Sequence, residues 1–291
     1  MDYLKTAKHL FHIFLINPNF FLKRVFFEIA AAISPFPEQP VFKNINGVMI
    51  NFDFKDEDKA RKMYFGTFQP AIADILKKYL KKGDTFIDAG ANVGYFTAVA
   101  AGLVGQSGQV HSFEPVQEYF QKLKNLKDKN SRYKITTNQL ALGDKEKTEK
   151  IYIGGPSHIG DNTFFLDFLE GISEVKSAEV KVVRLDKYIK DNDLCNIKLI
   201  KIDVEGFEFP LLLGMEEYFL ECSKTGNYPK IICEICPKAY SYLGKKLEDL
   251  FDYMKNFSYE PFETINENIG VNINKLKERD VADVLFKPAG N

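Results

Sequence analysis

A buried strand that runs directly into a glycine-containing loop and then a helix is the feature that most constrains the fold. Residues 85–89 are mostly apolar and predict the strand. Gly90 and Gly94 mark the loop, and the apolar residues 95–104 predict the helix. The chain repeats this unit, with further strands predicted at 109–113, 134–140, 199–202 and 231–235. Repeated β-α-β units predict a parallel sheet with helices on both faces.

Other helices and strands are predicted around these units. Apolar residues at helical spacing predict helices at 69–81, 116–127, 209–219 and 243–256, and a short one at 186–191. Apolar and polar residues alternate at 48–54, which predicts a strand there. Strands are also predicted at 148–153 and 179–185, on either side of a loop-rich insertion. A final antiparallel pair is predicted at 259–262 and 281–286.

The chain of 291 residues divides into an N-terminal helical arm, a small β-element and a core. We place the arm at 1–40, the β-element at 41–68 and the core at 69–291. Both apolar runs of the arm are shorter than the ~20 residues that a membrane-spanning helix needs. The arm packs on the core, forms an oligomer interface, or lies on a membrane surface, where its basic residues would face anionic headgroups: Lys5, Lys8, Lys23 and Arg24.

Positive and negative charges nearly cancel, with 39 basic and 40 acidic residues. No chain-wide positive field is available to attract nucleic acid, so we expect no nucleic-acid partner. The four cysteines are too few for a disulfide framework. Cys233 and Cys236 have C-x-x-C spacing around a predicted strand, where positions three apart face opposite sides. We therefore expect reduced thiols and a cytoplasmic protein. Any peripheral contact with a membrane is expected to be made by the arm.

The loop after residues 85–89 discriminates between ligands. Ligands of open α/β sheets bind at the carboxyl ends of the strands, where Gly90 and Gly94 let the backbone turn tightly. A dinucleotide-binding loop has a further glycine, G-x-G-x-x-G, which Gly90-Ala91-Asn92-Val93-Gly94 lacks. Asp88 would repel a diphosphate and suits a cationic ligand such as S-adenosylmethionine, which carries an ammonium and a sulfonium group.

A second acid stands at the end of the next predicted strand. Glu114 and Pro115 follow residues 109–113 directly. A carboxylate at this place accepts hydrogen bonds from both hydroxyls of a ribose. Glu114 could also be an ordinary solvated loop residue. Because it follows the Asp88 loop at the spacing of a cofactor site, we favour its role in binding a ribose.

These two motifs resemble those of class I methyltransferases, and a third motif narrows the resemblance. D-x-G-A-N-x-G-x-x-T, then F-E-P, then K-I-D-V-E-G-x-E at 201–208 is similar to the FkbM family of S-adenosylmethionine-dependent methyltransferases, over residues 64–237. The resemblance implies a Rossmann-like class I methyltransferase fold, α/β, with a mostly parallel sheet flanked by helices. It implies S-adenosylmethionine as the cofactor, Asn92, Pro115 and Asp203 among the residues that bind it, and Leu140 and Ala141 beside the adenine.

The resemblance also implies the kind of acceptor. O-methylation of a hydroxyl is common in the family, so we expect a sugar, a glycan or a secondary metabolite as the acceptor. Two positions depart from the family pattern. Gln69 stands before Pro70 where glutamate is common, and Cys236 stands where histidine is common. Both departures bear on the acceptor and not on the cofactor.

Methyl transfer to a hydroxyl needs close alignment and help in removing the proton. Asp203 follows residues 199–202 and is the first candidate for a general base or an acceptor-orienting residue. Glu205 is the second candidate, and Lys201 and Glu234 are expected to shape the charge around them.

Three further roles complete the expected site. His158 lies in a glycine-rich loop of the insertion, where a lid or acceptor wall is expected, and is a candidate catalytic residue beside its reading as a solvated loop histidine. Glu208 is interpreted as a cap of the helix that follows it. A divalent metal on the clustered carboxylates is the alternative to a base. We favour the base and assign no metal ligand.

Three other classes of protein share this kind of fold. A nicotinamide-dependent oxidoreductase needs the glycine pattern that is missing here. A nucleic-acid methyltransferase would show a P-P-Y/F/W or P-C motif in place of Asp203-Val204-Glu205-Gly206 and a phosphate-tracking surface. A non-catalytic Rossmann-like binding protein would have lost the acids of its cleft, whereas Asp88, Glu114 and Asp203 are present.

Overall fold

The structure is a computed structural model of the whole chain. It describes residues 18, 21, 22, 25, 29, 40–54, 57–154, 162–169 and 175–290. The predictions for the arm therefore lie almost entirely outside the described residues. Among the described residues, no helix combines the length and the apolar character needed to cross a membrane.

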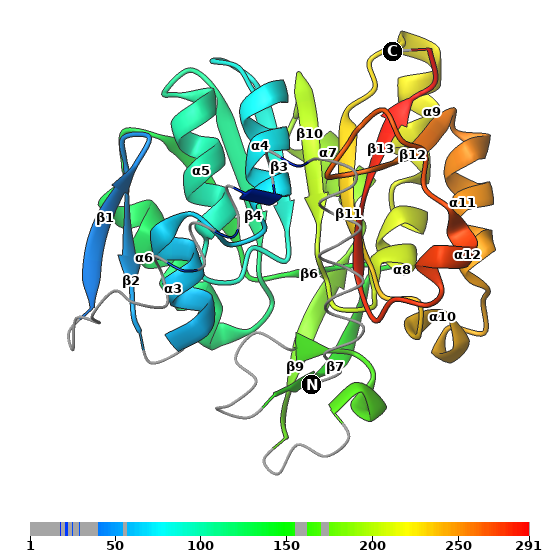
Figure 1. Cartoon of the computed structure of the whole chain (residues 1–291), viewed down its shortest axis with the longest axis horizontal. Helices are drawn as coiled ribbons and strands as arrows, with labels where there is room; N and C mark the ends of the chain where they lie inside the picture. The colour runs from blue at the N-terminus through cyan, green and yellow to red at the C-terminus, as the bar shows by residue number, and fades with distance from the viewer. Residues whose placement is uncertain are drawn as a thin grey trace.

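A seven-stranded sheet forms the centre of the molecule (Figure 1). Its strands, in spatial order, are β12 (Tyr259–Glu263), β13 (Ala282–Pro288), β11 (Lys230–Ile235), β10 (Ile197–Ile202), β3 (Thr85–Ala89), β4 (Gln109–Phe113) and β5 (Lys134–Asn138). The five strands from β11 to β5 are parallel, and β13 runs antiparallel to both of its neighbours. This arrangement confirms the predicted mostly parallel sheet and its final antiparallel pair.

Both faces of the sheet are apolar because its central strands are buried on both sides. Adjacent residues enter different cores: Phe86 packs under one face and Ile87 under the other. The first face is covered by α4 (Pro70–Tyr79), α5 (Tyr95–Val104) and α6 (Gln117–Lys129). The second face is covered by α7 (Leu185–Asp191), α8 (Glu208–Leu213), α9 (Glu216–Thr225), α10 (Ala239–Tyr242) and α11 (Leu247–Asn256). The short α12 (Ile273–Leu276) precedes β13.

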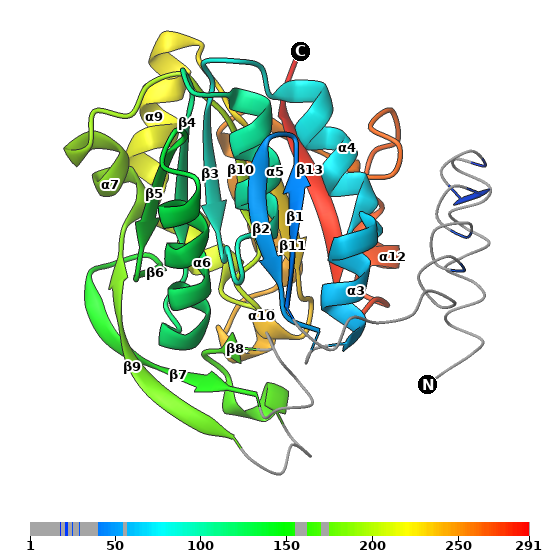
Figure 2. The ribbon, with the colours of Figure 1, turned by 90° about the vertical axis from the view of Figure 1, so that its left-hand side faces the viewer.

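The β-element before the core is larger than the single strand predicted at 48–54. It is a hairpin of β1 (Val41–Ile45) and β2 (Val48–Phe52), followed by α3 (Glu57–Phe65). Buried side chains of β2, among them Ile50 and Phe52, pack in the same core as α5 and α6. The hairpin therefore packs on α5 and α6, the helices that cover the first face of the sheet (Figure 2).

The insertion builds a second, smaller sheet below the central one (Figure 2). Its order is β6 (Ala141–Leu142), β9 (Lys176–Val183), β7 (Lys147–Ile153) and β8 (Asn162–Thr163), and the short 3₁₀ helix η2 (Leu166–Leu169) follows β8. The predicted strands at 148–153 and 179–185 are thus β7 and most of β9, which pair antiparallel.

One helix predicted as continuous is divided, and another is shorter than predicted. The helix predicted at 209–219 is wrong as a single element, because α8 ends before Gly214 and α9 starts at Glu216. A Cβ atom on Gly214 would lie 2.0 Å from the carbonyl oxygen of Gly143, so the chain bends where two backbones touch. The helix predicted at 243–256 is likewise shortened, since Gly244 adopts a left-handed φ of 63° between α10 and α11.

We predict that Gly214→Ala lowers the free energy of unfolding by about 2–3 kcal/mol, because the added methyl group overlaps backbone that cannot move independently. Gly270→Ala is the matched control. Gly270 is exposed, its φ is unexceptional, and an added Cβ would lie 3.9 Å from its nearest neighbour. Its effect should stay below about 1 kcal/mol. Urea denaturation of both variants measures the difference, and equal effects would contradict the close contact.

Candidate functional site

A cavity of about 640 Å³ opens at the carboxyl edge of the parallel strands. It is bounded by the loops after β3, β4 and β10, by the end of β11, and by β2, α3 and α6. Most of the residues selected from the sequence line it: Gly90, Asn92, Glu114, Pro115, Leu140, Ala141, Lys201, Asp203 and Glu205. Asp88 and Gly94 do not line it, and His158 lies outside the described residues.

The loops after β3 and β10 touch at Gly90. Gly90 has a φ of 79°, and a Cβ atom there would lie 1.7 Å from the carbonyl oxygen of Asp203. The backbone N–H of Asp203 donates to the carbonyl oxygen of Ala89 at 3.0 Å. Only glycine permits the backbones at positions 90 and 203 to come this close. The contact fixes the backbone position of Asp203, from which its side chain extends.

Gly94 has a packing role instead. Its φ is 88°, and a Cβ atom would lie within 3.0 Å of the side chains of Leu123 and Leu126 on α6. The start of α5 is therefore drawn close to α6, which closes the loop beside Asn92 and Glu114.

Glu114 is buried at the end of β4, where only 4% of it is exposed. Its Oε2 accepts the backbone N–H of Asn92 and its Oε1 accepts the backbone N–H of Val116, both at 2.9 Å. Each oxygen keeps a further lone pair for a ligand. Burial raises the pKa of Glu114 to about 7, although the two backbone hydrogen bonds oppose this rise.

Lys201 is the buried cation at the centre of the site. Its Nζ lies 2.8 Å from Asp203 Oδ2, 3.9 Å from Asp88 Oδ1 and 5.2 Å from the ring centroid of Phe96. Burial alone would lower the pKa of Lys201, but Asp203 and Asp88 raise it further than burial lowers it. Lys201 therefore stays charged and balances the acids on the two neighbouring strands.

Asp88 is a core residue and not a wall of the cavity. It is fully buried, and its Oδ2 accepts a hydrogen bond from Thr97 Oγ1 at 2.7 Å. Burial raises the pKa of Asp88, and Lys201 and Thr97 oppose this rise. Its structural task is to hold α5 and Lys201 against β3.

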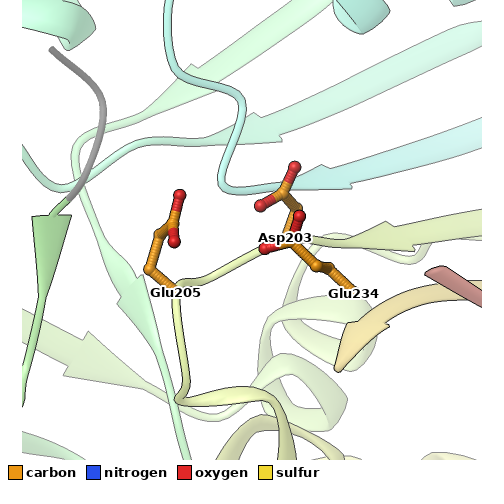
Figure 3. A group of neighbouring side chains, drawn as sticks. All are labelled: Asp203, Glu205 and Glu234. Carbon is orange, nitrogen blue, oxygen red and sulfur yellow. The ribbon is translucent and has the colours of Figure 1, made fainter. Parts of the chain in front are cut away.

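Three carboxylates converge at the carboxyl ends of β10 and β11 (Figure 3), and one of them, Asp203, is paired with Lys201. Asp203 and Glu205 come from the loop after β10, and Glu234 comes from the end of β11. One oxygen from each lies within 4.8 Å of the other two. Carboxylate oxygens are the ligands that Mg²⁺ and Ca²⁺ prefer, so these three are the residues that could hold a divalent ion.

Carboxylates this close cannot all ionise easily. Burial raises the pKa of Glu234 well above its usual range, and Asp203 and Glu205 add to the rise. Asp283 pairs with Glu234 across β11 and β13, and burial together with Asp203 raises its pKa to about 7. A proton or a cation is therefore favoured at this end of the cavity.

Glu208 shapes the loop that carries Asp203 and Glu205. It is fully buried at the first position of α8, and its Oε1 accepts the backbone N–H of Gly206 at 2.8 Å. Glu205 and Gly206 both have left-handed backbones, with φ of 52° and 101°. The hydrogen bond stabilises this bend in the loop before α8, and the role of Glu208 as a cap of the helix stays a prediction.

The insertion reaches the same loop. Thr163 Oγ1 donates to the carbonyl oxygen of Glu205 at 2.9 Å. Phe164 packs on Phe207 with ring centroids 4.3 Å apart, and Phe165 lies 5.5 Å from Tyr242. Of these aromatic residues, Phe164 lines the cavity.

Three residues have a closer relation to the site than the sequence predicts. Glu234 was assigned only an effect on charge, yet it joins Asp203 and Glu205 directly. No sequence motif marks Asp283, because it comes to stand opposite Glu234 only through the antiparallel pairing of β11 and β13. Gln69 was noted only as a departure from a family pattern, and it lines the cavity.

The strand order and the acid-lined strand ends define the class I methyltransferase fold. The family model of the methyltransferase FkbM domain matches residues 88–261, more than half of the chain. The chain therefore belongs to the FkbM methyltransferase family.

Individual similar proteins share less. A protein-L-isoaspartate O-methyltransferase of Methanococcus aeolicus is 29% identical over 150 residues, which cover 49% of this chain and 65% of that protein. A methyltransferase FkbM of Methylobacillus flagellatus is 16% identical, with a TM-score of 0.43 over 81% of this chain and 55% of that one. Aeropyrum pernix fibrillarin, solved with S-adenosylmethionine, is 10% identical, with a TM-score of 0.40 over 88% and 86% of the two chains.

We predict that Lys201→Met lowers the free energy of unfolding by about 3–5 kcal/mol, because it leaves buried carboxylates without their cation. The deficit should shrink as the pH falls, since protonation neutralises Asp88, whose pKa burial already raises. Lys198→Met is the control on the same strand, where the side chain is exposed. Thermal and urea unfolding at several pH values measure both, and a pH-independent deficit would argue against the charge explanation.

Proposed function

We propose that the protein transfers the methyl group of S-adenosylmethionine to a hydroxyl of a sugar, a glycan or a secondary metabolite. The observation that carries this proposal is that one cavity contains both Glu114 and the carboxylates around Asp203. The first group suits a ribose, and the second suits a positively charged sulfur and a hydroxyl that must lose a proton.

The residues present fit this cofactor. Glu114 offers a lone pair on each oxygen to the two ribose hydroxyls. On one side of Glu114 the cavity is apolar, with Leu140, Ala141 and Leu142, which suits an adenine ring. On the other side it is acidic, which suits the ammonium and sulfonium groups. When bound, S-adenosylmethionine supplies an electrophilic methyl group.

The acceptor hydroxyl would lie among the three carboxylates. Asp203 is held by Lys201 and has a defined orientation, so it would accept a hydrogen bond from the hydroxyl and align it. Glu205 offers a second acceptor on the same loop. Burial raises the pKa of Glu234, which makes its carboxylate a stronger base for the proton that the hydroxyl releases. The excess of negative charge disfavours an anionic acceptor such as nucleic acid.

A divalent ion on Asp203, Glu205 and Glu234 is the alternative route to an activated hydroxyl, and the proton-accepting route needs no such ion. The two routes differ in one measurement. Transfer that continues after dialysis against EDTA supports the base, whereas transfer that stops and returns with added Mg²⁺ supports the ion.

We predict that S-adenosylhomocysteine binds and that Glu114→Gln weakens it by about 10- to 100-fold, because a charged hydrogen-bond acceptor is lost. The wild-type affinity should fall below about pH 7, since the pKa of Glu114 is about 7 and the protonated carboxyl group accepts fewer hydrogen bonds. The variant should lack this pH dependence.

Isothermal titration calorimetry measures these affinities, and Glu118→Gln, exposed on α6, is the control. No binding of S-adenosylhomocysteine by the folded wild-type protein would contradict the proposed cofactor. Binding of NADH in its place would point to an oxidoreductase.

We predict that Asp203→Asn lowers methyl transfer by at least about 100-fold while the affinity for S-adenosylhomocysteine falls by less than about tenfold, because Glu205 and Glu234 keep acidic groups beside the ammonium. The assay follows tritium from the methyl group of S-adenosylmethionine into a panel of mono- and oligosaccharides. Asp252→Asn, on the exposed side of α11, serves as the control. Label released as methanol in alkali would indicate a carboxyl acceptor, because methyl ethers of hydroxyls resist alkali.

A further inference from the structure

Gln69 has an unusual backbone for a residue with a long side chain. It stands directly before Pro70 at the start of α4, with φ 39° and ψ 60°, in the left-handed region. Residues other than glycine rarely adopt this conformation, and it persists only where the surroundings impose it. The Gln69 side chain does not cap α4, so capping does not explain why a polar residue stands here.

The segment around Gln69 is fixed by neighbouring contacts. The backbone N–H groups of Thr67 and Phe68 donate to the carbonyl oxygen of Lys62 at 2.7 Å and 3.1 Å. The Phe68 ring packs on Tyr95 and Phe96, with ring centroids 5.8 Å and 5.9 Å apart. These contacts hold the turn at the first residues of α5, and the Gln69 side chain takes no part in them.

The Gln69 side chain instead lines the cavity. Its Oε1 is buried, and no donor among the described residues lies within hydrogen-bonding distance of it. A buried carbonyl oxygen without a donor destabilises the protein, so such an atom is expected to meet its donor in a ligand.

The order of the strands shows which part of the ligand this would be. Leu140 and Glu114 follow β5 and β4, and Asp203 follows β10 beyond β3. A cofactor with its ribose at Glu114 and its adenine toward Leu140 points its other end toward β3 and β10. Phe68, which stands just before α4, packs on Tyr95 and Phe96 at the start of α5, the helix that follows β3, so the first residues of α4 lie at that other end.

We infer that Gln69 binds the amino-acid end of S-adenosylmethionine, with Oε1 accepting a hydrogen bond from the α-ammonium group. This inference rests on the proposed function. An amide matches this end of the cofactor because it carries an acceptor for the ammonium and two donors for the carboxylate. Gln69 stands between Phe68, which packs on the first residues of α5, and Pro70, which starts α4.

Calorimetry with two ligands tests the assignment. S-adenosylhomocysteine carries the amino-acid group, whereas 5′-methylthioadenosine keeps the adenosine and the thioether and lacks that group. Gln69→Gly removes the side chain and keeps the left-handed backbone at no steric cost. We expect this variant to bind S-adenosylhomocysteine about tenfold more weakly and 5′-methylthioadenosine as tightly as the wild type does. Where direct heats are small, displacement of S-adenosylhomocysteine gives the second affinity.

Ser258→Gly is the matched control, because Ser258 also has a left-handed φ of 63° and does not line the cavity. It should leave both affinities unchanged. An unchanged affinity of Gln69→Gly for S-adenosylhomocysteine would overturn the assignment and leave the cofactor proposal intact. An equal loss for both ligands would overturn it as well, since that result indicates a distorted site. If the wild type binds neither ligand, the proposed function itself fails.

Discussion

The ammonium group of Lys201 links the core of this protein to its candidate site. It is buried where β3 and β10 lie side by side, and in their pairing Lys201 stands opposite Asp88. An unpaired charge at this depth would be strongly destabilising, so the two strands must bring their acids to the same place. Asp88 in turn holds Thr97 of α5, and Asp203 enters the cavity from the other side. One ion-paired group thereby fixes a strand pair, a helix and the orientation of a candidate catalytic side chain.

Part of the irregular backbone of the molecule lies at the same edge of the sheet. Gly90, Asn92, Glu205 and Gly206 all have positive φ, and all stand just after a parallel strand. Such conformations persist where the surrounding structure determines them, and they are common at binding sites. Here the surrounding constraints are visible: the carbonyl of Asp203 against Gly90, and the carboxylate of Glu208 under the bend at Gly206. The regular sheet gives these loops a rigid base.

Local patterns predicted the parts of the structure that depend on neighbouring residues. The parallel strands were found because apolar runs bounded by turns form buried strands, and Glu114 and Asp203 were placed because they follow those runs directly. The break between α8 and α9 is not predicted because a single glycine such as Gly214 is tolerated inside a helix, and the contact that bends the chain there is made with Gly143, far away in the sequence. The hairpin partner β1 and the helix α3 were missed because each gains its stability by covering the core.

By itself, the sequence determined the class of fold, the membership of the FkbM family and the edge of the sheet at which acids collect. These follow from periodicity and from motifs whose residues are close together in the chain. Only the tertiary structure decided that Glu234 lies within 4.8 Å of Asp203 and Glu205, that Asp283 stands beside it, and that Gln69 faces the same cavity. The physical reason is that these distances are set by strand pairing and helix packing between distant segments, and local patterns carry no information about either.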